Sequence, residues 1–173
     1  MTDLVDPARA ADGHRSGFVS LVGRPNAGKS TLTNALVGEK VAITSAKPQT
    51  TRHTIRGIVH KPDHQLIIVD TPGLHKPRTL LGSRLNDLVV ATLSEVDVIG
   101  FCLPADEPIG PGDRYIASQL ALLDGRTPIV ALVTKVDTVS QDKVAEALLA
   151  VSELADFADV IPVSAVDGFQ VGT

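Results

Sequence analysis

The sequence predicts an α/β fold built on one mostly parallel β-sheet, and three observations support this prediction. Short apolar segments alternate with segments of helical periodicity along most of the chain. Several apolar segments are followed directly by polar clusters, as is typical of the carboxyl edge of a parallel sheet. One pair of apolar segments is joined by a short turn around residues 61–63, which is too short for a parallel connection. We therefore expect a three-layer αβα sandwich with six strands, one of them an antiparallel edge strand.

The composition is typical of a globular domain. Of the 173 residues, 43% are apolar and 21% are charged, and the formal net charge is −4. This acidic balance argues against nucleic-acid binding by the chain acting alone, although it leaves room for local basic patches. No apolar stretch approaches the ~18 residues that a membrane span needs, and the single cysteine, Cys102, falls within an apolar segment. We expect a buried thiol and a cytoplasmic location, where thiols stay reduced.

The chain divides into a tail and one domain. Residues 1–16 lack a periodic apolar pattern and are expected to form a flexible N-terminal tail, and residues 17–173 are expected to form the domain. Strands are predicted at 18–23, 54–60, 65–70, 98–103, 128–133 and 160–163, and helices at 28–37, 85–96, 113–123 and 143–154. Ser140 is the expected N-cap of the last of these helices. Because few residues follow the last strand, we expect a closing helix to be missing.

A glycine-rich loop between the first strand and the first helix predicts phosphate binding. The motif G-x-x-x-x-G-K-S spans residues 23–30, and its strand–loop–helix setting supports the interpretation as a P-loop of the P-loop NTPase fold. The backbone N–H groups and the helix N-terminus would hold phosphates, with Lys29 beside the outer ones and the Ser30 hydroxyl as a Mg²⁺ ligand. The predicted binding residues are Gly23, Arg24, Pro25, Asn26, Ala27, Gly28, Lys29, Ser30 and Thr31.

A second cluster follows the strand that ends at Asp70. It has the pattern D-x-x-G, and a carboxylate in this place can reach Mg²⁺ directly or through water. Gly73 has no side chain, so its N–H can approach a terminal phosphate and sense its loss on hydrolysis. The predicted nucleotide-binding residues here are Asp70, Thr71, Pro72, Gly73 and Leu74.

Two further clusters predict a guanine site. The strand at 128–133 leads into T-K-x-D, with Thr134, Lys135 and Asp137, and the last strand leads into Ser164 and Ala165. A carboxylate accepts hydrogen bonds from the adjacent N1–H and N2–H of guanine, whereas adenine offers an acceptor there. The Lys135 stem would stack on the purine, and the backbone at 164–165 would face the guanine oxygen.

Two longer sequence motifs make this interpretation more specific. Residues 48–53 (PQTTRH) and 70–77 (DTPGLHKP) resemble signatures of the Era family of translation-factor-related GTPases, and the resemblance extends over about residues 17–170. It implies that Thr51, less readily Thr50, binds Mg²⁺ in the GTP state, with Lys29, Thr51 and Gly73 as the catalytic group. Residues 38–54 and 73–84 would be the two switches. The implied role is GTP-dependent assembly of the 30S subunit, with 16S rRNA binding and peripheral membrane contact by a monomer.

The sequence departs from the family pattern in three ways. Thr134 replaces the usual asparagine, so we expect weaker nucleotide affinity with unchanged base choice. Leu74 stands where Ras-like enzymes carry a glutamine that orients water, so intrinsic hydrolysis should be slow. Asn26 is a candidate K⁺ ligand, as in related GTPases, or it braces its own loop. The C-terminal KH domain that would bind RNA is not found in this chain.

Three functional hypotheses follow. The first is a GTP-hydrolysing switch that uses Mg²⁺, with help from the backbone, a monovalent cation such as K⁺ or a partner. The second is a GTP- or GDP-dependent binding module with negligible hydrolysis unless the ribosome or K⁺ activates it, and Leu74 supports this alternative. The third, an ATP-dependent kinase, is disfavoured by Asp137 and by the D-T-P-G sequence at 70–73.

Overall fold

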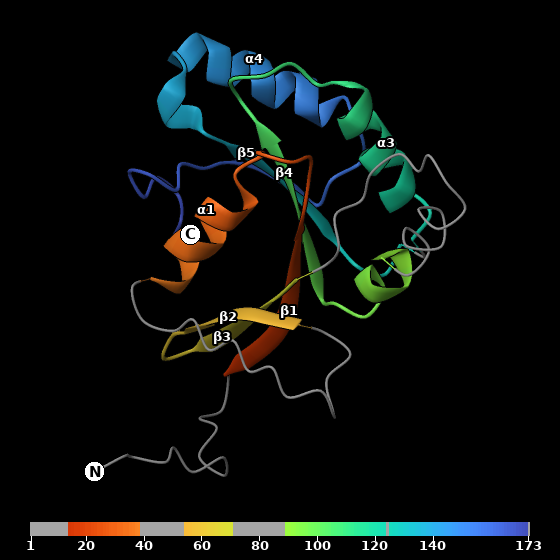
Figure 1. Ribbon diagram of the computed structural model, residues 1–173, viewed down its shortest axis with the longest axis vertical. Coiled ribbons are helices and arrows are strands. Elements are labelled where there is room, and N and C mark those ends of the chain that lie inside the picture. Colours follow the sequence, from red (N-terminus) through yellow and green to blue (C-terminus); the bar gives the residue numbers. More distant parts are fainter. Residues whose placement is uncertain (1–13, 39–53, 71–88, 124, 173) are drawn as a thin grey trace.

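The computed structural model describes residues 14–38, 54–70, 89–123 and 125–172, and Figure 1 shows their arrangement. The six strands are β1 (Arg15–Val22), β2 (Thr54–His60), β3 (His64–Asp70), β4 (Val98–Pro104), β5 (Ile129–Thr134) and β6 (Asp159–Pro162). The helices are α1 (Lys29–Val37), α3 (Pro111–Leu120), the short 3-10 helix η1 (Val136–Thr138) and α4 (Gln141–Ser152). Residues 89–93 are also helical.

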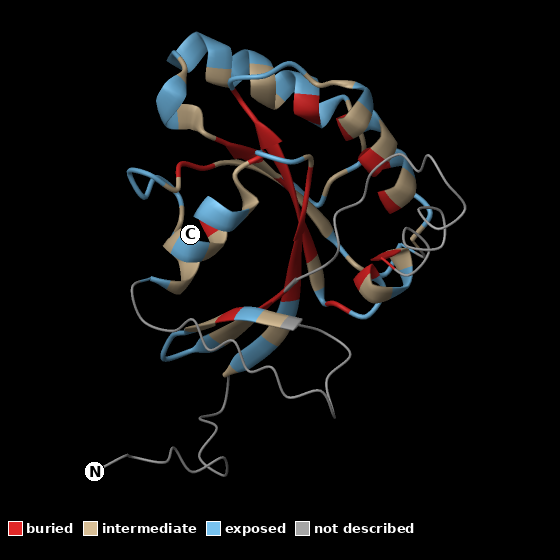
Figure 2. Cartoon of the chain, in the orientation of Figure 1, coloured by how far each residue is buried: buried red, intermediate tan, exposed pale blue. Residues whose placement is uncertain are grey.

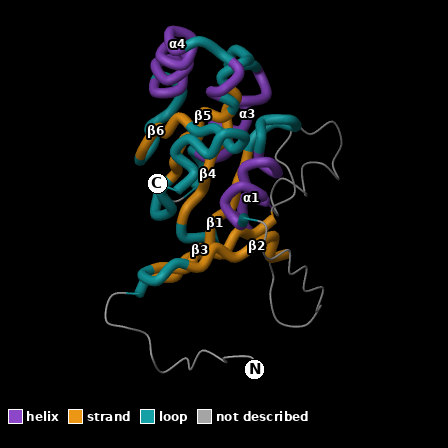
Figure 3. Tube along the Cα trace, turned by 90° about the vertical axis from the view of Figure 1, so that its left-hand side faces the viewer, coloured by secondary structure: helices purple, strands orange, loops and turns teal. Residues whose placement is uncertain are grey.

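The strands form one sheet in the order β2-β3-β1-β4-β5-β6, and Figure 3 shows it from β2 and β3 in the lower part of the molecule to β5 and β6 in the upper part. All neighbouring pairs are parallel except β2 with β3. The predicted six-stranded sheet with one antiparallel edge strand is therefore confirmed. The antiparallel pair has an irregularity between Ile55 and Gly57, where an added Cβ on Gly57 would lie 2.3 Å from a Val37 side-chain atom of α1.

Alternate side chains of the central strands build two cores on opposite faces of the sheet. On one face Phe101 of β4 packs with residues of the 89–93 helix, α3 and α4. On the other face Cys102 packs with Leu32 of α1 and Val163 after β6. Figure 2 shows the buried central strands between these two layers. The period-2 alternation of a strand thus produces the predicted αβα sandwich, and Cys102 is fully buried as expected.

Two helices begin earlier than the apolar pattern predicted. Helix α3 starts at Pro111, since the Asp113 carboxylate accepts a hydrogen bond from the Gly110 N–H at 2.9 Å and a proline suits the first turn. Helix α4 starts at Gln141 because Ser140 is its N-cap, with the Ser140 hydroxyl accepting from the Lys143 N–H. The N-cap prediction for Ser140 is therefore confirmed.

The first strand is longer than predicted. It begins at Arg15, and Arg15 and Ser16 pair with His64 and Gln65 of β3. These first residues are exposed, so they carry no apolar signal that sequence reasoning could use. Among the residues that the structure describes, no helix is both long and apolar enough to cross a membrane.

Candidate nucleotide-binding site

Loops that follow three parallel strands meet at one edge of the sheet. These loops come after β1, β5 and β6, and Figure 1 shows the segment between β1 and α1 at the upper end of β1. A cavity of about 220 Å³ lies between them. It is lined by Gly28, Thr31, Leu32, Thr134, Lys135, Asp137, Thr138, Val163, Ala165 and Val166. The structure therefore brings the end of the glycine-rich loop together with the two predicted base-binding clusters.

The glycine-rich loop has the backbone that its glycines predicted. Gly28 lies in the left-handed region at φ 88°, and Gly23 has φ 150°. An added Cβ on Gly23 would lie 2.6 Å from the Cys102 carbonyl oxygen, so only glycine fits beside β4. Gly28 is also the N-cap of α1 and supplies no side chain to the helix. The first N–H groups of α1 therefore have no capping side chain and form an end that can bind an anion.

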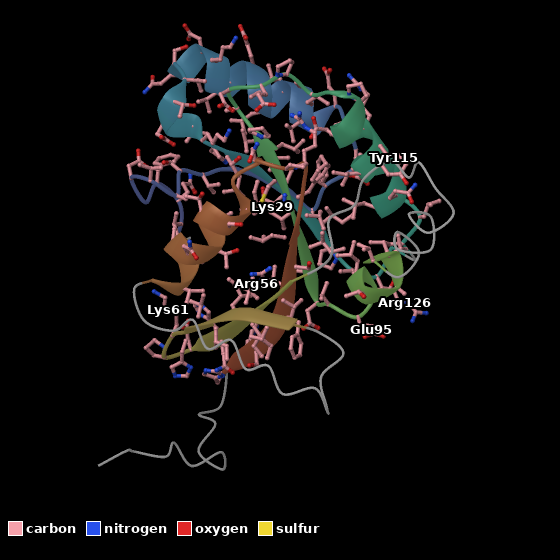
Figure 4. The ribbon with its side chains drawn as sticks, in the orientation of Figure 1. Lys29, Arg56, Lys61, Glu95, Tyr115 and Arg126 are labelled. Atoms are coloured by element: carbon pink, nitrogen blue, oxygen red, sulfur yellow. The ribbon has the colours of Figure 1, made fainter. Side chains whose placement is uncertain are left out.

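Lys29 is held by the loop itself. Its Nζ donates to the carbonyl oxygens of Gly23 and Arg24, at 2.8 and 2.6 Å. Figure 4 shows Lys29 between the start of α1 and the central strands. These two carbonyl oxygens hold the ammonium group at the glycine-rich loop, beside the start of α1. Ser30 and Thr31 follow in the first turn of α1, and both are exposed.

Asp137 is oriented by a buried serine. The Ser164 hydroxyl donates to Asp137 Oδ1 at 2.7 Å, and Ser164 has 0% exposure. The Asp167 N–H donates to the same hydroxyl oxygen at 3.3 Å, which ties the loop after β6 to this pair. The sequence predicts only a backbone role for Ser164. The structure shows that its side chain also contacts Asp137.

Thr134 connects the base-binding strand to the glycine-rich loop. Its hydroxyl donates to the Ala27 carbonyl oxygen at 2.7 Å, and the residue is 3% exposed. An added Cβ on Gly28 would lie 3.4 Å from Thr134. The hydroxyl has one proton, and this bond uses it. Thr134 therefore braces the loop but has no further donor to offer.

Lys135 has the left-handed conformation, with φ 59° and ψ 32°, directly before η1. Its carbonyl oxygen accepts hydrogen bonds from the Thr138 N–H and hydroxyl at 3.0 and 2.8 Å. Its Nζ lies 3.3 Å from Asp106 Oδ2, and both side chains are partly exposed. Because Lys135 also lines the cavity, its stem is available to a bound purine.

Arg24 was predicted to bind nucleotide, and the structure places its guanidinium on α3. Arg24 Nε donates to Asp113 Oδ1 at 2.7 Å, and Nη1 lies 3.1 Å from Glu107 Oε2. The hydrogen bond with Asp113 raises the pKa of the Arg24 guanidinium above its usual value. Nothing in the glycine-rich motif indicates this contact, because its partners lie far along the chain.

Several predicted site residues lie outside the described part of the chain. These are Thr50, Thr51, Thr71, Pro72, Gly73 and Leu74. Asp70 ends strand β3, as predicted, in register with Thr54 of β2. The carboxyl end of β3 therefore lies beside that of β1, which precedes the glycine-rich loop.

The sheet order, the glycine-rich loop and the T-K-x-D cavity define a P-loop nucleotide-binding domain. A family model described as "50S ribosome-binding GTPase" matches residues 18–135. Because this match covers more than half of the chain, the chain belongs to this GTPase family.

Comparison with individual proteins confirms the resemblance to Era. The chain is 70% identical over 158 residues to GTPase Era of Mycobacterium avium, with 91% of this chain and 53% of the relative covered. It thus spans about half the length of the curated relatives that it matches.

Solved structures of Era have the same fold. The chain is 33% identical, with a TM-score of 0.71, to Era in complex with MgGDPNP and nucleotides 1506–1542 of 16S ribosomal RNA, covering 91% of this chain and 53% of that one. Era of Aquifex aeolicus bound to GDP·AlF4⁻ gives 32% identity and a TM-score of 0.68, with coverages of 91% and 54%.

Proposed function

We propose that this chain is the GTP-binding and GTP-hydrolysing part of an Era-like protein that acts in 30S ribosomal subunit assembly. The observation that carries the proposal is the cavity that joins Gly28 of the glycine-rich loop to Asp137 and Ala165. Ser164 holds the Asp137 carboxylate at this cavity. A guanine there would donate N1–H and N2–H to that carboxylate, while its phosphates extend over the loop.

Phosphate binding would change the hydrogen bonds of Lys29. Its ammonium now has two carbonyl partners, and a β- or γ-phosphate oxygen is a stronger, charged acceptor. The first N–H groups of α1 and the positive end of its dipole would hold the same phosphates. We therefore propose that the backbone N–H groups of the loop and the ammonium group of Lys29 bind the phosphates together.

Magnesium would suit the residues present. The exposed Ser30 lies in the first turn of α1, and the β3 strand that ends at Asp70 pairs with β1. A hydroxyl and a carboxylate are the hard oxygen donors that Mg²⁺ prefers. When bound, the ion would neutralise charge on the phosphate oxygens. Ser30, Thr51 and Asp70 are the residues that we propose hold it, and the Era complex with MgGDPNP supports the use of Mg²⁺ with the nucleotide.

Hydrolysis should be slow in the isolated chain. Leu74 cannot orient the attacking water, so help must come from the backbone, a monovalent cation or a partner. Asn26, which is exposed in the glycine-rich loop, is the proposed K⁺ ligand, because its side-chain carbonyl oxygen is a hard donor. The relative bound to GDP·AlF4⁻ and the family name support hydrolysis over the alternative of a pure binding module.

The proposed role in ribosome assembly is supported by related proteins. An Era structure contains a segment of 16S rRNA, and we propose that the protein to which this chain corresponds acts on the same class of RNA. The acidic net charge of −4 favours RNA contact through a region other than this chain, such as the KH domain that the resemblance implies. A monomeric state, a cytoplasmic location and peripheral membrane contact remain parts of this proposal.

Single-turnover phosphate release tests the proposal. The purified chain is mixed with radiolabelled GTP and Mg²⁺, in buffer containing either K⁺ or Na⁺. We expect slow release of one phosphate per bound GTP, faster with K⁺, and none with Lys29→Ala. GTP binding without release under either condition would favour the binding-module alternative, and absence of GTP binding would contradict the proposed function.

A further inference from the structure

Arg24 makes two different contacts, one through its backbone carbonyl and one through its side chain. Its backbone carbonyl oxygen accepts a hydrogen bond from Lys29 Nζ at 2.6 Å. Its side chain donates from Nε to Asp113 Oδ1 at 2.7 Å. One residue therefore contacts both the phosphate-binding lysine and helix α3.

The Asp113 end of this connection is fixed. Asp113 is 1% exposed and lies in the first turn of α3. Its second oxygen, Oδ2, accepts from the Gly110 N–H at 2.9 Å, so both carboxylate oxygens are used. A buried carboxylate with two hydrogen bonds is a rigid acceptor, since leaving either bond unmade is costly.

Packing around the side chain reinforces the connection. An added Cβ on Gly112 would lie 2.8 Å from Arg24 Cδ, so the stem of Arg24 lies directly against the backbone of α3. The outer nitrogen Nη1 is 3.1 Å from Glu107, which is far more exposed than Asp113. The guanidinium is thus held firmly on its Asp113 side and loosely on its Glu107 side.

We propose that Arg24 is a positioning residue. Its side-chain contact with Asp113 fixes its backbone carbonyl, and this carbonyl orients Lys29. Helix α3 therefore sets the position of the phosphate-binding lysine. The inference rests on the proposed nucleotide function. It assigns Arg24 no contact with the nucleotide. Loss of the contact would let the backbone at residue 24 turn, and the Arg24 carbonyl oxygen would no longer orient Lys29 Nζ.

The test compares ligands that differ only in phosphate number. GMP, GDP and the analogue GDPNP are titrated by calorimetry with Mg²⁺ into the wild type, Arg24→Gln, Asp113→Asn and the double variant. Lys29 serves the outer phosphates. We therefore expect each single variant to bind GDP and GDPNP about tenfold more weakly and GMP within twofold of the wild type. The double variant should be no weaker than the weaker single variant, because both changes break one connection.

A general structural role gives a different result. If affinity for GMP falls as much as affinity for GDP, or if the two single effects multiply, the positioning role is wrong. Unchanged GDP affinity in both single variants overturns it as well. If Asp113→Asn fails to fold, the positioning role is tested in Arg24→Gln alone. The loss of affinity for GDP is then compared with the loss for GMP.

Glu107→Gln is the matched control, because it removes the exposed partner of the same guanidinium. We expect twofold or smaller changes for every ligand, and a tenfold loss would overturn the assignment to Asp113. A wild-type chain that binds neither GDP nor GMP would instead contradict the proposed function itself.

Discussion

The Ser164 hydroxyl donates a hydrogen bond to Asp137 Oδ1 across 2.7 Å, and this contact joins the loops after β5 and β6. Ser164 is fully buried, whereas Asp137 is exposed at the cavity. The buried residue therefore determines the direction of the exposed one. In the proposed guanine site, base recognition would therefore depend on a serine side chain that does not need to touch the base.

Removing that hydroxyl should weaken nucleotide binding. A hydrogen bond to a charged group contributes about 1.5–3 kcal/mol, so we expect Ser164→Ala to raise the Kd for GDP about tenfold or more. Calorimetric titration measures the change. Ser152→Ala is the control, because the Ser152 hydroxyl bonds to the Leu149 carbonyl oxygen at the end of α4, away from the cavity. Equal affinities of the two variants would contradict the positioning of Asp137 by Ser164.

Asp137 should control the choice of base. The carboxamide of Asp137→Asn can donate to the additional oxygen of xanthine, whereas a carboxylate only accepts. We expect the variant to prefer XDP over GDP, and the wild type to prefer GDP. Competition between the two nucleotides for a fluorescent analogue measures this preference. Persistent selection of GDP by the variant would show that another group recognises the base.

Thr134 should stabilise the fold as well as the site. Thr134→Val keeps the shape of the side chain but leaves the Ala27 carbonyl oxygen without its 2.7 Å donor. An unsatisfied buried acceptor costs about 1–3 kcal/mol. Urea unfolding of the nucleotide-free chain should show a loss in that range. Thr134→Ser retains the hydroxyl and should lose less than half as much, and a serine variant as unstable as valine would exclude the hydrogen bond as the cause.

Cys102 should resist thiol reagents in the folded chain. Burial raises the pKa of its thiol to about 12, against an ordinary value of 9.0. A raised pKa means that the folded state retains the proton longer, so this group stabilises folding below about pH 9 and loses that contribution as pH rises toward 12. We expect no reaction with Ellman's reagent at pH 8 until urea unfolds the chain. Rapid labelling of folded protein would contradict the burial of the thiol.

The sheet and the placement of the site could be predicted because their signals are local. Apolar segments gave the strands, and the short turn at 61–63 gave the antiparallel pair. Clusters at strand ends predicted one functional edge, and Gly28, Asp137 and Ala165 do line one cavity there. Parallel topology places such clusters together whatever their separation along the chain.

The contacts that orient the site could not be predicted. Arg24 bonds to Asp113, 89 positions away, and Thr134 bonds to Ala27 across 107 positions. Neither pair has a sequence pattern, because their approach depends on the packing of α3 and on strand order. Helix α3 also begins at Pro111, two residues before the start at Asp113 that the apolar pattern predicts.

The central claim is that one guanine nucleotide lies between the glycine-rich loop and the T-K-x-D segment, and a ¹H–¹⁵N correlation titration tests it most directly. With GDP and Mg²⁺, the amides of Gly28, Lys29, Asp137 and Ala165 should shift and saturate at one equivalent, while those of the β2–β3 hairpin at 60–64 stay unchanged. ADP at the same concentration should leave Asp137 and Ala165 unshifted. Equal shifts with ADP, or the largest shifts at the hairpin, would contradict the account.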